Sequence, residues 1–479
     1  MTVAVSCVES PRQEREALYE RFHSKLATNP HLNRSIVSFQ ANQKLPFYRW
    51  LKYKEGFSVD FVEYAIKKLT ISKGLLLDPF AGTGTTLFTA IRLGWDGIGI
   101  ELLPLGFFAM SARLAAKSLG IRKFKRELER IEGTKWSSYF DPKFKLAHVP
   151  ITEGAFPSET ERSIAGYRAY CARIKDGNLK KLLDLACLSV LESVSYTRKD
   201  GQYLRWDYRA GKARTKSNFD KGRIAEFDSA IHKKLCEIYD DLHNTGESTT
   251  GLFDKGMRKE EVGALDLRKG SCLEILPRIK AESIDMVLTS PPYCNRYDYT
   301  RTYALELVYL GVNADELKTL RQNMLSCTVE NKAKVNQLGD FYERSGQKKA
   351  FDRVMQVFKG QKALHEVLGI LEGLGITGEL NNTNIPNMIR NYFLEMAFVI
   401  YELGRILRPG GKIVMVNDNV RYAGEEIPAD LILSDFSRRF GMQTETIWTL
   451  GRGKGNSSQQ MGSHGRSELR KCVYVWKKD

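Results

Sequence analysis

The chain has 479 residues, of which 42% are hydrophobic and 27% charged, and its formal net charge is +16 at pH 7. It is too long for one average domain, it lacks the run of about 20 apolar residues that spans a bilayer, and its N-terminus does not have the pattern of a secretory signal. We therefore expect neither a membrane protein nor a secreted one, and the positive charge favours a polyanionic partner.

The eight cysteines are scattered along the chain, with no CxxC pair and no neighbouring histidine pair at the spacing of metal ligands. This pattern predicts reduced thiols in a cytoplasmic protein and no metal site.

The first predicted elements form a strand, a glycine-rich loop and a helix. Residues 74–78 are a short apolar run, and residues 85–93 have helical spacing. Residues 95–100 form a second predicted strand that ends at Glu101. Together they make up the first half of a predicted α/β core.

Further strands and helices follow after a long interruption. Residues 283–288 are a predicted buried strand, and residues 388–407 an amphipathic helix that stops at an Arg-Pro-Gly-Gly turn. Three more strands are predicted at residues 412–416, 443–450 and 472–476. Because strands alternate with helices, we predict an α/β fold with a mainly parallel sheet that binds ligands at the carboxyl ends of its strands.

The predicted organisation has six parts, in which two inserted lobes interrupt the core. These parts are an N-terminal segment (1–70), the first half of the core (71–110), an inserted lobe (111–262), the second half of the core (263–311), a helical insert (312–387) and the C-terminal part of the core (388–479). We expect target recognition in the 111–262 lobe.

The loop after the first strand has the features of a nucleoside-binding turn. Gly82 and Gly84 allow close approach of a ligand to the backbone, and Glu101 can accept both hydroxyls of a ribose. No lysine follows the glycines, which disfavours a nucleoside triphosphate, and a dinucleotide fingerprint would need a third glycine. An acidic Asp78 suits a cofactor with a cationic sulfonium and no phosphate. An ordinary glycine-rich turn is the alternative.

This loop and four other segments resemble motifs of the amino-methylating DNA methyltransferases, the family that methylates cytosine N4 or adenine N6. Residues 53–58 (YKEGFS) are similar to the segment that holds the methionine end of the cofactor, and 98–104 to the ribose-binding strand. Residues 289–293 (TSPPY) match the catalytic motif, and residues 407–411 the helix end before the fifth strand. The resemblance covers a little under half of the chain.

The resemblance implies a Rossmann-like, S-adenosylmethionine-dependent methyltransferase core with a seven-stranded, mainly parallel sheet. The cofactor-binding residues that it implies are Phe57, Ser58, Asp78, Pro79, Phe80, Gly82, Gly84, Thr85, Thr86 and Glu101. One departure is that residues 270–272 (GSC) offer no carboxylate for the adenine amino group, where the family often has an acid.

The predicted catalytic residues are Ser290, Pro291, Pro292 and Tyr293. The lone pair of an exocyclic base amine is delocalised into the ring, so catalysis needs hydrogen-bond acceptors around the amine. Consecutive prolines have no N–H and can hold the preceding carbonyls inward, while Tyr293 offers a face on which a flipped base stacks.

In the resembled family, serine at the first position of this motif is typical of enzymes that methylate cytosine N4, whereas aspartate or asparagine is typical of adenine N6. We therefore predict cytosine N4, with adenine N6 as the alternative. Cys294 follows Tyr293, but transfer to an amine needs no thiol nucleophile, and we expect this cysteine to be a packing residue.

Residues 195–223 are the leading DNA-binding candidate, with nine Lys or Arg, three Asp and interleaved aromatic residues. The predicted DNA-binding residues are Arg198, Lys199, Arg205, Arg209, Lys212, Arg214 and Arg296. A solvated basic loop is the alternative for this segment. A second candidate is the glycine-rich, cationic loop 451–466, for which the alternative is a hairpin tip.

The predicted function is site-specific methylation of duplex DNA by a cytoplasmic, nucleoid-associated prokaryotic enzyme, with a restriction endonuclease as a candidate partner. RNA amino methylation is a second interpretation, although only about 50 residues precede the core, fewer than the RNA-binding domain that such enzymes usually carry. A catalytically silent nucleic-acid binder is a third, and the intact glycine loop and Ser-Pro-Pro-Tyr motif argue against it.

Overall fold

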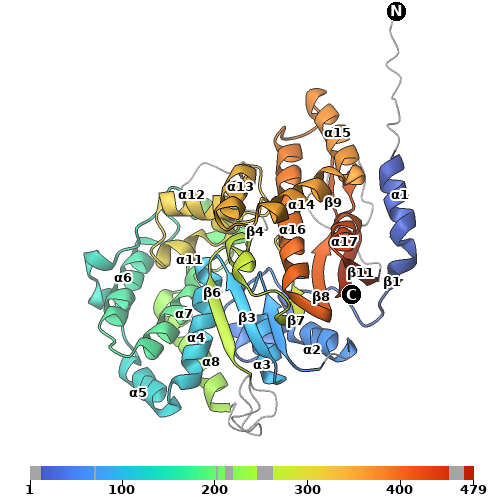
Figure 1. Cartoon of the computed structure of the whole chain (residues 1–479). Coiled ribbons are helices and arrows are strands. Elements are labelled where there is room, and N and C mark those ends of the chain that lie inside the picture. Colours follow the sequence, from blue (N-terminus) through green and yellow to red (C-terminus); the bar gives the residue numbers. More distant parts are fainter. Residues whose placement is uncertain (1–11, 70–71, 201–202, 211–218, 245–262, 452–468) are drawn as a thin grey trace, which may run out of the picture. The chain divides into compact units, whose positions relative to one another are not determined.

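The computed structural model describes residues 12–69, 72–200, 203–210, 219–244, 263–451 and 469–479. The chain divides into two compact units, and both combine strands with helices (Figure 1). Unit 1 comprises Met1–Asn33, Leu276–Arg296 and Leu325–Asp479, and unit 2 comprises Arg34–Ile275 and Tyr297–Met324. The predicted α/β class is confirmed.

Unit 2 contains a parallel sheet of three strands in the order β2–β3–β6. These strands are β2 (Leu75–Asp78), β3 (Asp96–Glu101) and β6 (Leu265–Lys269). Helix α3 (Thr85–Arg92) connects β2 to β3, which confirms the predicted strand, loop and helix. The last residue of β2, Asp78, lies opposite Gly99, and β3 continues two residues further to Glu101, so these parallel strands end at the same edge of the sheet.

The rest of unit 2 is mostly helical. Its helices are α2 (Val59–Lys68), α4 (Pro104–Ser118), α5 (Ile121–Ile131), α6 (Ser158–Ala172), α7 (Gly177–Val194), α8 (Phe227–Asn244), α9 (Cys272–Ile275), α10 (Tyr299–Thr302), α11 (Ala304–Tyr309) and α12 (Ala314–Asn323). Helix α7 packs against α4 and α8 (Figure 1) and buries a leucine-rich face in the core of this unit. A two-stranded antiparallel hairpin, β4 (Thr197–Asp200) and β5 (Tyr203–Trp206), follows α7.

Unit 1 contains five strands in the order β1–β11–β12–β8–β7. They are β1 (Leu26–Thr28), β7 (Ile284–Thr289), β8 (Leu407–Asp418), β11 (Met442–Thr449) and β12 (Lys471–Lys478). Strand β7 is parallel to β8 and β1 is parallel to β11, whereas β12 is antiparallel to both of its neighbours. The four residues Val473 to Trp476 of β12 are fully buried, which is typical of a central strand.

Two details of the sheets differ from the sequence predictions. Among the described residues, the main sheet has eight strands, five of unit 1 and three of unit 2, which is one more than the expected seven, because the short strand β1 pairs with β11. The Arg-Pro-Gly-Gly segment was expected as a turn, yet β8 begins at Leu407 and includes it. Gly410 takes a φ of 76° and the register against β7 shifts there, so the glycines form an irregularity within the strand.

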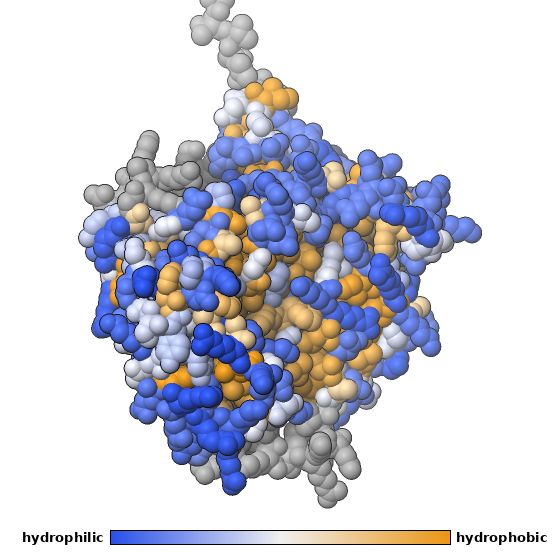
Figure 2. Space-filling model, turned by 90° about the vertical axis from the view of Figure 1, so that its left-hand side faces the viewer, coloured by the Kyte–Doolittle hydropathy of each residue, from blue (hydrophilic) through white to orange (hydrophobic). Residues whose placement is uncertain are grey.

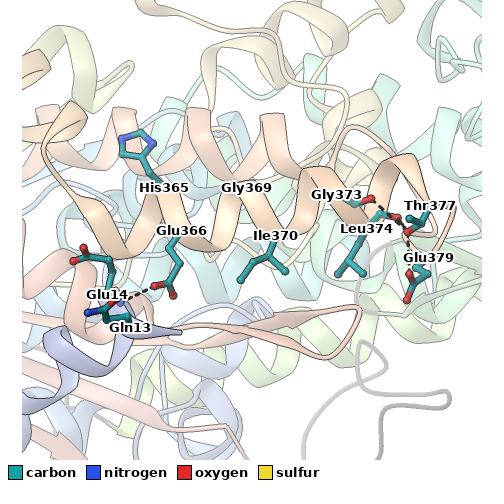
Figure 3. Close-up of a pocket in the computed structure, with 10 residues that line it drawn as sticks. All are labelled: Gln13, Glu14, His365, Glu366, Gly369, Ile370, Gly373, Leu374, Thr377 and Glu379. Atoms are coloured by element: carbon teal, nitrogen blue, oxygen red, sulfur yellow. Dashed lines mark hydrogen bonds between the residues drawn. The ribbon is translucent and has the colours of Figure 1, made fainter. Parts of the chain in front are cut away.

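The helices and remaining strands of unit 1 are α1 (Gln13–Phe22), α13 (Val335–Arg344), α14 (Lys348–Lys359), α15 (Lys362–Ile376), α16 (Ile385–Ile406), α17 (Ala429–Arg439), β9 (Val420–Tyr422) and β10 (Glu425–Ile427). Helix α16 corresponds to the helix predicted over residues 388–407. Helices α1 and α15 flank a shallow groove of about 650 Å³ (Figure 3), beside which Arg15 forms an ion pair with Glu366 at 2.8 Å.

Figure 2 shows one face of the molecule, on which hydrophilic residues surround groups of hydrophobic ones. Within the described ranges, we find no helix with the length and apolar character that crossing a membrane requires.

Candidate active site

The glycine-rich loop of unit 2 turns sharply between β2 and α3. Gly82 and Gly84 have φ values of 54° and 82°, in the left-handed region that favours glycine. The Gly84 N–H donates to the Ala81 carbonyl at 2.7 Å, and the Phe80 N–H donates to the Asp78 carboxylate at 3.1 Å. The predicted loop residues therefore lie together at the carboxyl end of β2.

Glu101 ends β3 beside this loop, with its carboxylate almost fully buried. One carboxylate oxygen accepts the Gly82 N–H and the other accepts the Leu103 N–H, each at 2.6 Å. Burial, and to a lesser degree the charge of Asp78, raise the pKa of Glu101 to about 8, although the two N–H donors act in the opposite direction. The Glu101 carboxyl thus provides hydrogen-bond acceptors, and its pKa lies near neutral pH.

Two observations test whether this loop fits a nucleoside cofactor. A Cβ added to Gly106 would lie 2.5 Å from the Gly82 carbonyl oxygen, so the helix after β3 approaches the loop more closely than any side chain allows. The Thr86 hydroxyl is buried and has no hydrogen-bond partner among the described residues. Because buried polar groups normally have partners, this hydroxyl fits a polar ligand group.

The predicted residues Phe57 and Ser58 precede helix α2. The Ser58 hydroxyl accepts the Phe61 N–H at 3.2 Å as the helix cap and donates to the Ile36 carbonyl at 2.7 Å. The Phe57 ring packs against Phe61, with 5.0 Å between ring centroids. Both predicted residues are therefore buried, and the Ser58 hydroxyl is engaged in local structure.

Arg113 supports the glycine loop, and sequence analysis did not identify it. Its guanidinium is fully buried and donates to the carbonyls of Thr83, Phe47 (3.1 Å) and Tyr48 (3.4 Å). Burial lowers its pKa to about 10. In the sequence Arg113 stands within an ordinary helical pattern, so no local signal marks it as a loop-bracing residue.

The Ser-Pro-Pro-Tyr corner belongs to unit 1 and directly follows β7. The Ser290 hydroxyl donates to the Val416 carbonyl at 3.2 Å, and its oxygen lies 3.1 Å from the Tyr293 hydroxyl. Because β7 and β8 are parallel, Val416 and the corner lie at the same edge of the sheet. Ser290 thus anchors the start of the corner to β8 near its carboxyl end, a contact that the sequence did not reveal.

Cys294 directly follows this corner in the sequence and is a buried thiol with 1% of its surface exposed. Burial raises its pKa well above the usual thiol value, so the nucleophilic thiolate is disfavoured. The Cys294 carbonyl accepts the Tyr422 hydroxyl at 2.8 Å. These contacts support the prediction of a packing role.

The described part of the basic segment 195–223 includes strands β4 and β5 and a short 3-10 helix, Tyr208–Ala210. The Arg198 side chain is exposed, whereas Lys199 is buried and forms an ion pair with Glu306 at 2.5 Å. Arg205 stacks over the Phe219 ring at 4.2 Å, and Arg209 forms an ion pair with Asp207 at 2.7 Å. The exposed aromatic side chains here are Tyr203 and Tyr208.

Of the remaining residues predicted to bind DNA, the structure describes Arg296. Arg296 belongs to unit 1, has a φ of 64° and donates to the Asn381 side chain at 3.3 Å. Lys212 and Arg214 lie outside the described residues, as does loop 451–466 beyond Gly451. The described residues hold no group of three or more His, Cys, Asp or Glu side chains able to bind a metal ion.

Comparison with known proteins gives two kinds of match. Residues 12–104, which include the glycine loop and Glu101, match the family model described as DNA methylase. The chain is 45% identical to the type II methyltransferase M.AvaI of Nostoc sp., in an alignment that covers 99% of this chain and 95% of the relative. It is 39% identical to M.BsoBI of Geobacillus stearothermophilus, with 98% and 93% covered, and 24% identical to M.MjaII of Methanocaldococcus jannaschii, with 53% and 61% covered.

Proposed function

Because this chain belongs to the DNA methylase family, among the type II DNA methyltransferases of restriction-modification systems, we propose that it transfers a methyl group to cytosine N4 in duplex DNA. The family implies DNA as the substrate and S-adenosylmethionine as the methyl donor. The atom that receives the methyl group and the residues that act are the subject of the proposal.

The choice of cytosine N4 as the methylated atom rests on Ser290 and its hydrogen bonds. Its hydroxyl donates its single proton to the Val416 carbonyl, so in the contact with Tyr293 the Ser290 oxygen accepts the phenolic proton, and one further lone pair of this oxygen can accept a hydrogen bond. The Ser290 oxygen, together with the carbonyls of Ser290 and Pro291, can accept hydrogen bonds from the N–H groups of the target amine. The amine lone pair is then available to attack, and the serine matches the residue type that N4 enzymes of the resembled family carry.

The cofactor is assigned to the glycine loop and its neighbours. When bound, it supplies an electrophilic methyl group on a sulfonium centre. Glu101 accepts the ribose hydroxyls, while the glycines admit the nucleoside next to the backbone. The other residues of the proposed binding site are Phe57, Ser58, Asp78, Pro79, Phe80, Thr85 and Thr86.

The DNA contacts are assigned to the exposed side of the β4–β5 hairpin. Arg198 is exposed and Arg205 half exposed, so they are suited to phosphate contact, and the exposed rings of Tyr203 and Tyr208 are suited to packing on sugar or base. Arg296 follows the catalytic corner and is assigned to the flipped base or its flanking phosphate. The lobe 111–262 is the proposed recognition lobe, and a restriction endonuclease of the same specificity is the proposed partner.

The target atom is tested by digesting methylated duplex DNA to nucleosides for mass spectrometry. We expect N4-methylcytosine, and N6-methyladenine would refute the choice based on Ser290. Tritium transfer from the cofactor to duplex DNA, single-stranded DNA and tRNA tests the substrate, and labelling confined to tRNA would refute DNA methylation.

The role of Tyr293 is tested by a pair of variants. Tyr293→Ala removes the ring on which the base stacks, so we expect transfer to fall by at least about a hundredfold, the scale of one or two stacking contacts. Tyr293→Phe keeps the ring, and most of the activity should remain. Calorimetry should show unchanged cofactor binding in both variants, and its loss in Tyr293→Ala would assign Tyr293 to the cofactor site instead.

A further inference from the structure

Lys199 lies in the most basic segment of the chain, yet its ammonium faces inward. It is 2.5 Å from the Glu306 carboxylate and 4.7 Å from the centre of the Tyr303 ring, and its side chain is 4% exposed. Arg198, its neighbour on β4, is exposed. Two adjacent cations of the same hairpin therefore lie in different environments, one buried and one exposed to solvent.

Tyr303 connects this ammonium to the segment that precedes helix α2. Its hydroxyl donates to the Glu55 carboxylate at 2.5 Å and accepts the Lys54 N–H at 3.0 Å. Its ring stacks on Tyr53, with 5.1 Å between centroids and an angle of 14°. One side chain thus holds three consecutive residues of the proposed cofactor segment.

The Tyr53 ring in turn packs against the glycine loop. A Cβ added to Gly82 would lie 3.2 Å from a ring carbon of Tyr53, which is closer than most carbon contacts. The series of contacts runs from Lys199 through Tyr303 and Tyr53 to Gly82, all within unit 2. Buried charge-assisted contacts of this kind restrict geometry strongly because a displaced partner would be left unpaired.

We propose that Tyr303 and Lys199 are positioning residues for the cofactor site: Tyr303 holds the Tyr53–Glu55 segment against the glycine loop, and Lys199 fixes Tyr303 and anchors the hairpin. Lys199 therefore supports cofactor binding and contacts no phosphate, unlike Arg198. The inference rests on the proposed assignment of the cofactor to the glycine loop.

The hydroxyl of Tyr303 is tested by Tyr303→Phe, with Tyr309→Phe as the matched control. Like Tyr303, which precedes α11, Tyr309 at the end of this helix is buried and donates to a carboxylate, that of Asp184, at 2.8 Å. Both variants lose one buried hydroxyl, so their melting temperatures should fall alike. We expect Tyr303→Phe alone to weaken S-adenosylmethionine binding about tenfold by calorimetry and to raise its KM, with kcat at saturating cofactor near wild type.

Lys199 is tested by Lys199→Met beside Arg198→Met. We expect Lys199→Met to weaken cofactor binding several-fold and to leave the salt dependence of duplex DNA binding unchanged. Arg198→Met should leave cofactor binding unchanged and lower the salt slope by about one, as expected for one lost phosphate contact. If Lys199→Met destabilises the fold, Glu306→Gln removes the ion pair while keeping the lysine and should give the same pattern.

Two results would overturn the inference: a Tyr303→Phe variant with wild-type cofactor affinity, or a Lys199→Met variant whose salt slope falls by one while its cofactor affinity is kept. Glu101→Gln separates these outcomes from a failure of the proposed site. If Glu101→Gln weakens cofactor binding while the other variants do not, only the positioning role fails. If Glu101→Gln also has no effect, the cofactor site itself is misassigned.

Discussion

The clearest quantitative prediction concerns the pH dependence of cofactor binding through Glu101. Its carboxyl has a pKa of about 8 in the ligand-free protein because it is buried. About 1% of the molecules are therefore ionised at pH 6 and about half at pH 8. Ribose hydroxyls donate hydrogen bonds, so they favour the ionised carboxylate and lower its pKa on binding.

Because ligand binding and ionisation of Glu101 are coupled, the affinity for the cofactor should depend on pH. Below pH 8 binding must release a proton, so affinity should rise with pH by about tenfold per unit, or about 1.4 kcal/mol. From pH 6 to pH 8 the ionised fraction rises from about 1% to about half, so the dissociation constant should fall by up to about fiftyfold, and above pH 8 it should level off. Glu101→Gln has no titrating carboxyl, so its affinity should be weaker at pH 8.5 and independent of pH.

The assay is calorimetry with methylthioadenosine, which carries the adenosine part of the cofactor but no amino acid tail that titrates in this range. Repeating the titration in buffers of different ionisation enthalpy counts the protons released. A wild-type affinity that is flat between pH 6 and pH 8, or an equal slope in Glu101→Gln, would refute the assignment of the ribose to Glu101.

Two further predictions concern the glycine loop. Gly84→Ala places a Cβ 2.8 Å from the Phe88 ring at a φ of 82°, so it should lower the free energy of unfolding in urea by about 1–3 kcal/mol. Gly133→Ala, at a φ of 67° with nothing within 4 Å, should cost only the strain of about 1 kcal/mol, and an equal loss would show that steric clash is not the cause. Arg113→Lys leaves carbonyls of the loop and its neighbours without donors, so unfolding free energy should fall by about 2–4 kcal/mol and cofactor affinity should fall with it. Full cofactor affinity in Arg113→Lys would refute its role in bracing the loop.

The sequence by itself determined the elements whose signal is local. Apolar runs and helical spacing identified β2, α3, β3, β7 and α16, because backbone geometry imposes a period of two or 3.6 residues on the buried face. Glycine and proline marked the loop at Gly82 and the corner at Pro291 for the same reason: their backbone preferences depend on no distant partner.

Only the tertiary structure decided which polar groups are buried and what they contact. Lys199 and Arg198 are equivalent in a sequence pattern, yet Lys199 is paired with Glu306, more than a hundred residues away. Likewise Arg113 reaches the Thr83 carbonyl and Tyr303 reaches Glu55 across long separations. Burial and pairing depend on how distant segments pack. Burial and pairing in turn determine whether a cation is expected to contact DNA or to hold a loop. They also determine whether a carboxyl group titrates near pH 8.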